Sequence, residues 1–95
     1  MDFEWDEHKR EANIIKHGID FFEITAVFED EYLLTLEDKR KDYGEKRYRT
    51  IGMVGDELLI AVIHTDRENA IRIISARRAK KKERRDYYGN REIHL

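Results

Sequence analysis

The sequence predicts a small α+β domain with two N-terminal helices packed on a four-stranded antiparallel sheet and a C-terminal helix. Three observations predict this class. Residues 6–30 carry apolar side chains at helical spacing, residues 31–78 contain four short extended runs joined by turns, and residues 79–89 form a charged helical stretch. Helices followed by strands with short connections are typical of α+β layer folds, in which the initial helices cover one face of the sheet.

The first helix is predicted over residues 6–18. Asp6 can cap its start, and Gly18 can end it in a left-handed turn. His8, Ala12 and Ile15 share one face at helical spacing. A polar stripe follows the same spacing on the same helix: Lys9, Asn13 and Lys16.

Residues 20–30 predict a second helix, in which Asp20 and Glu23 have the spacing of a capping box. The hydrophobic period then changes from helical to extended. Four strands are predicted, separated by a charged connection at residues 39–45 and by short turns: residues 31–37, 46–54, 58–65 and 70–78. Residues 79–89 predict the closing helix.

Length and composition narrow the class of protein. The chain has 95 residues, which suits one domain over residues 1–95. It contains no cysteine and no histidine pair at zinc-ligand spacing, so we expect neither a metal nor a cofactor. No apolar run reaches the ~18–20 residues that span a bilayer, and the acidic start lacks the apolar segment of a signal peptide. We therefore expect a cytoplasmic protein without a membrane partner.

Charge is distributed unevenly along a chain whose formal net charge is −2. Residues 1–38 hold three Lys or Arg and twelve Asp or Glu, a balance of −9, whereas residues 67–95 hold ten and four, a balance of +6. A basic surface of this kind suits a polyanion such as RNA. On composition alone, the more common explanation of such a run is a solvated helix face, or a face paired with the acidic first third.

Strand alternation divides the side chains of residues 70–78 between two faces. Arg72 and Arg78 are predicted on the open face of the sheet. Arg77 is predicted on the opposite face with Ile73, which the first two helices would cover.

The open face, the turn after residue 65 and the closing helix can converge on one groove that combines arginines, an imidazole, a carboxylate and a phenol: His64, Arg67, Arg72, Glu83 and Tyr87. This set fits RNA cleavage without a metal, because the RNA 2′-hydroxyl can attack its own phosphodiester once the phosphate is held. Arginine holds phosphate oxygens, and a His, Glu or Tyr can move protons. The alternatives are a hydrogen-bonded structural His64 and a Tyr87 that packs the last helix on the sheet.

Several blocks of the sequence resemble the BrnT toxins. The stretch "FEWDEHKREANIIKHGI" is similar to their opening signature, and "RYRTIG", "HTDR" and "IRIISARRAKKKERRDYY" follow in the same order. The resemblance runs from Phe3 to Tyr88. It implies a RelE-like fold and a bacterial ribonuclease toxin that blocks translation. It also implies neutralisation by a BrnA antitoxin with a ribbon-helix-helix domain, in a complex of two toxins with two antitoxins that represses its own operon through operator DNA.

The resemblance also implies site residues in the "HTDR" turn and the last block. The implied catalytic positions are His64, Arg67, Arg72, Arg77, Glu83 and Tyr87. Among the expected RNA-binding positions, Arg78 and Arg84 are implied by the resemblance, and Lys80, Lys81 and Arg85 are expected from the run of positive charge. Glu83 is our substitute for a carboxylate in the turn, which here reads "ENA". The stripe of Lys9, Asn13, Lys16 and His17 belongs to the signature and serves either RNA or folding.

Two other functions compete with a ribonuclease toxin. One is a module that binds RNA or a protein partner without cutting it. The other is a DNA-binding repressor subunit, which the overall acidity and the lack of a helix-turn-helix pattern disfavour.

Overall fold

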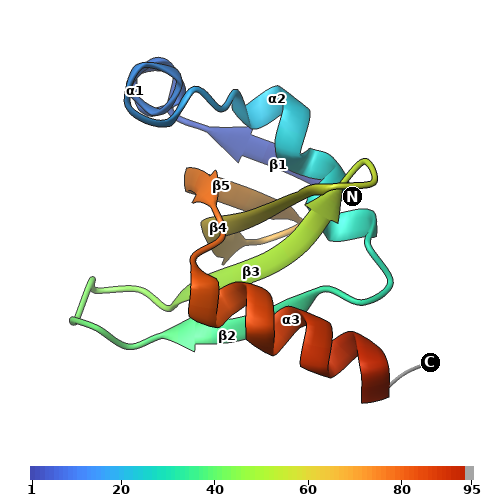
Figure 1. The fold of residues 1–95 in the computed structure, drawn as a ribbon. Coiled ribbons are helices and arrows are strands. Elements are labelled where there is room, and N and C mark those ends of the chain that lie inside the picture. The colour runs from blue at the N-terminus through green and yellow to red at the C-terminus, as the bar shows by residue number, and fades with distance from the viewer. Residues whose placement is uncertain (94–95) are drawn as a thin grey trace.

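The computed structural model describes residues 1–93 and shows a five-stranded mixed sheet with helices on both faces (Figure 1). The strand order is β1-β5-β4-β3-β2. The elements, in chain order, are β1 (Asp2–Trp5), α1 (Glu7–His17), α2 (Phe21–Ile24), the 3₁₀ helix η1 (Thr25–Glu29), β2 (Leu34–Asp38), β3 (Arg47–Val54), β4 (Leu58–Arg67), β5 (Ala70–Arg78) and α3 (Lys81–Ile93). The predicted α+β class is confirmed.

The sequence does not predict β1. This strand pairs with β5 in parallel, from Asp2 opposite Ala70 to Trp5 opposite Ile73. The prediction of a four-stranded, fully antiparallel sheet is therefore wrong, because the sheet has a fifth strand and that strand pairs in parallel. Four residues are too few to show a period, and their partner lies near the other end of the chain. The four predicted strands do form, and they pair antiparallel in the order β2, β3, β4 and β5.

The first helix has the predicted ends. The Asp6 carboxylate accepts hydrogen bonds from the backbone N–H groups of His8 and Lys9, and Gly18 ends the helix at φ 69°. The second helix is shorter than predicted, because α2 has four residues and the chain continues as the five-residue η1. Asp20 still caps it by accepting from the backbone N–H of Phe22.

Two apolar clusters fill the two sides of the sheet. On the side of α1, α2 and η1, the buried residues are Ile19, Phe21, Ile24, Val27, Ile60, Val62, Ile73 and Ala76. On the α3 side they are Ile51, Leu59, Ala61 and Tyr87. Gly52 lets η1 approach the sheet closely, because a Cβ there would lie 2.8 Å from Val27 Cγ1. Two sheet residues that line the candidate site, Ile63 and Arg77, lie on the same face of the sheet as Ala61 of the α3-side cluster.

A β-bulge in β5 decides which arginines share a face. Ile63 pairs with Ser75, whereas the next residue of β4, His64, pairs with Ile73, so Ile74 is an extra residue. The alternation shifts by one at this point, and Ile73 and Ala76 both lie in the helix-side core.

Because of this bulge, Arg72 and Arg77 lie on the same face of the sheet. The prediction that they lie on opposite faces is therefore wrong. Arg78 follows Ala76 by two positions, so it lies on the same face as Ala76, which is the helix side of the sheet. The prediction that Arg78 lies on the open face is therefore wrong.

Candidate functional site

A cationic groove of about 360 Å³ lies between α1, the end of β5 and the β2–β3 connection. These three segments lie on the same side of the molecule, at the left of Figure 1. The groove is lined by Lys9, Ala12, Asn13, Lys16, His17, Arg40, Ile63, Ile74, Ser75 and Arg77. This lining contains no carboxylate, whereas each of three other surface hollows is lined by at least two. The groove therefore suits an anion.

Asn13 fixes α1 against the sheet. Its side-chain amide accepts from the Ala76 backbone N–H at 3.0 Å and donates to the Ala76 carbonyl at 2.8 Å. It also donates to the Ile19 carbonyl at 2.9 Å. β1 pairs with β5 only as far as Ile73, so this amide takes the place of a neighbouring strand at Ala76. The buried side chain of α1 is thus Asn13 of the polar stripe, while Ile15 of the other predicted face is 87 % exposed.

Glu83 gathers cations at the junction of β5 and α3. Arg77 donates two hydrogen bonds to its carboxylate, at 2.7 and 3.0 Å, and Arg49 of β3 lies 3.4 Å away. The backbone N–H of Lys80 donates a third hydrogen bond at 2.8 Å, which caps the start of α3. Burial alone would raise the pKa of Glu83, but the bonds from Arg77 and Lys80 outweigh burial and hold that pKa below its usual range. Glu83 is therefore ionised, and it holds Arg77 and Arg49 in place through ion pairs.

The cations of the groove differ in how far they are neutralised. Arg40 donates two hydrogen bonds to Asp38, and these lower the pKa of the Asp38 carboxyl to about 2. Arg77 is paired with Glu83. Lys9 and Lys16 are exposed and form no ion pair with any residue from 1 to 93. The two lysines of α1 are thus the uncompensated charges at the rim.

Arg67 and Arg72 lie at the other end of the sheet. Arg72 sits next to β1, where its guanidinium pairs with Glu4 at 3.2 Å. Arg67 lines a separate hollow with Asp2, Glu4 and Glu68. Arg77 lies five positions after Arg72, or about 15 Å along an extended strand. The structure therefore does not bring the five predicted arginine, histidine, glutamate and tyrosine positions into one groove.

His64 is buried on the helix side of the sheet, away from the groove. Its Nε2 is 2.7 Å from Thr50 Oγ1, and its ring packs edge-on against Phe28. Burial lowers the pKa of His64, against a weaker opposite effect of Asp66, so the imidazole is neutral at pH 7. This is the hydrogen-bonded structural histidine that we weighed as the alternative.

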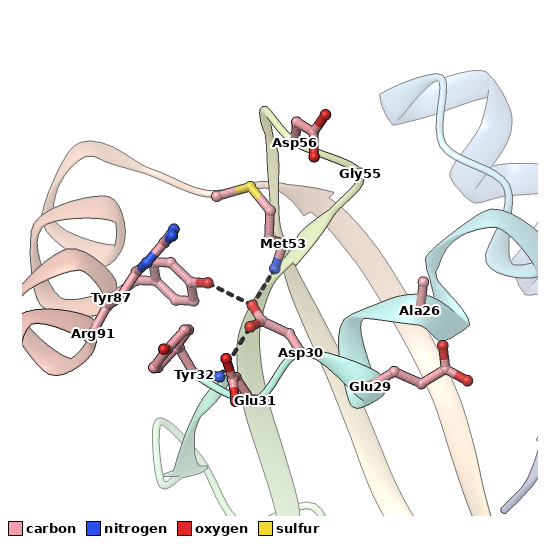
Figure 2. Close-up of a pocket in the computed structure, with 10 residues that line it drawn as sticks. All are labelled: Ala26, Glu29, Asp30, Glu31, Tyr32, Met53, Gly55, Asp56, Tyr87 and Arg91. Carbon is pink, nitrogen blue, oxygen red and sulfur yellow. Dashed lines mark hydrogen bonds between the residues drawn. The ribbon is translucent and has the colours of Figure 1, made fainter. Parts of the chain in front are cut away.

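Tyr87 is also buried, at the contact between α3 and the chain after η1 (Figure 2). Its hydroxyl donates to Asp30 Oδ2 at 2.6 Å, and the same oxygen accepts from the Met53 backbone N–H at 2.7 Å. Burial and the bond to Asp30 raise the pKa of the Tyr87 phenol. Tyr87 therefore joins α3 to η1 and β3, and its hydroxyl is not presented to the groove.

The predicted RNA-binding residues at the end of β5 and the start of α3 are exposed. Arg78, Lys80, Lys81, Arg84 and Arg85 all present their side chains to solvent. Glu83 ties the first turn of α3 to Arg77, which lines the groove. Lys80, Lys81, Arg84 and Arg85 therefore add exposed positive charge to the chain segment that begins beside Arg77.

The sequence patterns did not identify Arg49 of the Glu83 cluster or several members of the groove. Arg49 could have been found from alternation in β3, because it shares a face with Ile51 of the α3-side core. The sequence places Lys16 and His17 in the polar stripe but leaves open whether they serve RNA or folding. Nothing in the sequence pattern points to Arg40, which reaches the groove from a connection of the sheet.

Residues 1–93 contain no group of three His, Asp or Glu side chains that could hold a metal ion. In the same part of the chain, no helix is long and apolar enough to cross a membrane.

Comparison with known proteins decides the family. Residues 5–83 match the family described as "Ribonuclease toxin, BrnT, of type II toxin-antitoxin system". The chain belongs to the BrnT family. A solved structure, the 1.1 Å crystal structure of the Brucella abortus ribonuclease toxin BrnT, is similar over 85 % of this chain and 99 % of that chain, with 32 % identity and a TM-score of 0.69. A search of curated proteins found no match.

The match to the BrnT family spans α1, the strands β2 to β5 and the start of α3 up to Glu83. It therefore covers the groove and the Glu83 cluster. As a member of a type II toxin–antitoxin family, the chain has an antitoxin as its expected partner.

Proposed function

We propose that this BrnT-family chain is an endoribonuclease that binds RNA in the cationic groove, cleaves it without a metal and thereby blocks translation in the cytoplasm. The observation that carries the proposal is the groove lining, which joins five basic side chains and no carboxylate. Lys9 and Lys16 offer uncompensated charge to the phosphates, and Arg77 offers a guanidinium fixed by Glu83. An RNA strand supplies its own nucleophile, the 2′-hydroxyl, so the protein needs to position the phosphate, neutralise it and move protons.

We further propose that a BrnA-type ribbon-helix-helix antitoxin inhibits the chain by covering the same surface. A segment of the antitoxin with acidic side chains would neutralise the exposed cations at the start of α3, among them Lys80, Lys81, Arg84 and Arg85. A complex of two toxins with two antitoxins would then reach operator DNA through the antitoxin.

Cleavage is tested with purified protein and single-stranded RNA in the presence of EDTA, and in cells by induction without the antitoxin. We expect RNA fragments in both cases, together with growth arrest in cells. Intact RNA in both assays would leave the alternative, a module that binds RNA or a protein without cutting.

The location of the RNA is tested with a matched pair of charge reversals. Lys16→Glu at the groove should weaken binding of a single-stranded oligonucleotide on the order of tenfold, because one phosphate contact becomes repulsive. Lys82→Glu makes the same charge change in the first turn of α3, at an exposed side chain that pairs with Asp86 and does not line the groove. Equal losses for the two variants would show that binding depends on net charge alone.

A further inference from the structure

The cleavage that we propose needs a group that removes the proton of the attacking 2′-hydroxyl. The three side chains that the sequence suggested for this step are buried or engaged in other contacts in the structure. His64 is buried on the other side of the sheet, Glu83 is held ionised by Arg77, and Tyr87 is bound to Asp30. Another group therefore has to supply the base.

His17 is the histidine of residues 1–93 that lines the cationic groove. His8 is exposed at the start of the same helix and lines none of the four hollows, and His64 is buried. The His17 ring is half-buried and makes no hydrogen bond or ion pair within the described chain. Both ring nitrogens are therefore available to a ligand in the groove.

The backbone holds His17 in a fixed place. It is the last residue of α1, and Gly18 follows in the left-handed conformation, with its N–H bonded to the Ile14 carbonyl at 2.8 Å. One turn earlier, Asn13 clamps the helix to Ala76 of β5. The imidazole is thus carried by a helix end that is fastened to the sheet beside Arg77.

The groups that face His17 would bind the phosphate and leave the imidazole to act as a base. Lys9 and Lys16 come from its own helix, Arg77 from β5 and Arg40 from the β2–β3 connection. No carboxylate of the lining competes for the imidazole. Ile63 and Ile74 provide an apolar floor on which an unpaired base can lie.

We propose that His17 is the general base of this ribonuclease and that the groove is the subsite of the scissile nucleotide. A ring nitrogen of His17 takes the proton of the 2′-hydroxyl, and the 2′-oxygen forms a bond to phosphorus. The bond from phosphorus to the 5′-oxygen breaks, and that oxygen takes a proton from solvent. The products are a 2′,3′-cyclic phosphate and a free 5′-hydroxyl, with no oxidant or other co-reactant.

The proposal rests on the proposed function, and the test separates the two. The substrate is a short single-stranded RNA, and the binding probe is the same sequence with 2′-deoxyribose, which lacks the nucleophile. We expect His17→Ala to lower the cleavage rate at least on the order of a hundredfold. Affinity for the deoxy probe should change by less than about threefold, because the cations that bind phosphate remain. His8→Ala is the matched control on the same helix and should cleave like the wild type.

Added imidazole distinguishes a lost base from a disturbed fold. It should restore part of the cleavage by His17→Ala in proportion to its concentration and should not affect His8→Ala. The wild-type rate should depend on pH as a base-catalysed step does, and this dependence should be absent from the variant.

Each possible outcome bears on the proposed function, on the role of His17, or on both. Wild-type protein that leaves RNA intact overturns the proposed function and this inference with it. Wild-type cleavage with an equally active His17→Ala overturns this inference and leaves the proposed function standing. Cleavage that is lost in His17→Ala but not restored by imidazole, while deoxy-probe affinity falls in parallel, also overturns it, because His17 would then only support the groove.

Discussion

Replacing Asn13 by alanine tests whether one amide holds the groove together. The substitution removes three hydrogen bonds, two to Ala76 and one to the Ile19 carbonyl. Ala76 is fully buried and Ile19 is 7 % exposed, so water cannot easily replace the amide. Each buried backbone group left without a partner costs about 1–3 kcal/mol, and partial relaxation lowers the total. We expect the free energy of unfolding to fall by about 3–5 kcal/mol.

The measurement is urea unfolding followed by circular dichroism. With an m-value of about 1.5 kcal/mol/M, a loss of 3 kcal/mol moves the midpoint down by about 2 M. Glu11→Ala on the exposed side of the same helix is the control and should stay within about 0.5 kcal/mol. A midpoint for Asn13→Ala within 0.3 M of the wild type would refute the idea that the amide substitutes for a strand.

Three further predictions follow from the same contacts. Tyr87→Phe should lower the free energy of unfolding by about 1–2 kcal/mol, because it removes the hydrogen bond to Asp30, but it should leave RNA cleavage unchanged. Tyr88→Phe, at an exposed tyrosine, is the control. Loss of cleavage in Tyr87→Phe would show that Tyr87 belongs to the site. Stability should decrease as pH falls below about 6.5, because burial lowers the pKa of His64 in the folded protein and the unfolded chain therefore binds the proton first. His64→Gln should flatten this part of the plot of urea midpoint against pH. An unchanged slope would contradict the assignment of this pH dependence to His64. RNA affinity should fall with salt with a log–log slope of roughly −2 to −3, as three or four phosphate contacts on a single strand require, and a flat response in filter binding would exclude the cationic surface.

The elements with a repeated pattern could be predicted from the sequence. α1 has both caps in the chain itself, and β3, β4 and β5 are long enough to show their period. β1 has four residues and depends on a partner near the far end of the chain, so no local signal marks it. The bulge at Ile74 adds a single residue, yet it reverses the face of every side chain that follows in β5.

The candidate site was predictable only in part, because its contacts are tertiary. The sequence marked Arg77 and Glu83 as functional positions but gave no sign that they pair with each other. The sequence also shows the polar stripe of α1. An amphipathic helix ordinarily buries the face that carries its apolar residues, so the polar face would be expected to be exposed. Here Asn13 is buried instead, because the exposed edge of β5 offers it an N–H and a carbonyl.

Ion pairing in the fold is compatible with the proposed RNA binding by a chain with net charge −2. Within residues 1–93, the acidic first third reaches the basic last third through one ion pair, Glu4 with Arg72, at the end of the sheet away from the groove. Among residues 1–93, Lys82 of α3 pairs with Asp86 of the same helix, and Arg77 of β5 pairs with Glu83 of α3, so no carboxylate of the acidic first third pairs with these cations. A field that acts over about a Debye length, 8–10 Å at physiological salt, is set by the nearest charges. An approaching phosphate strand therefore meets the lysines and arginines of the groove before it is affected by the net charge of the protein.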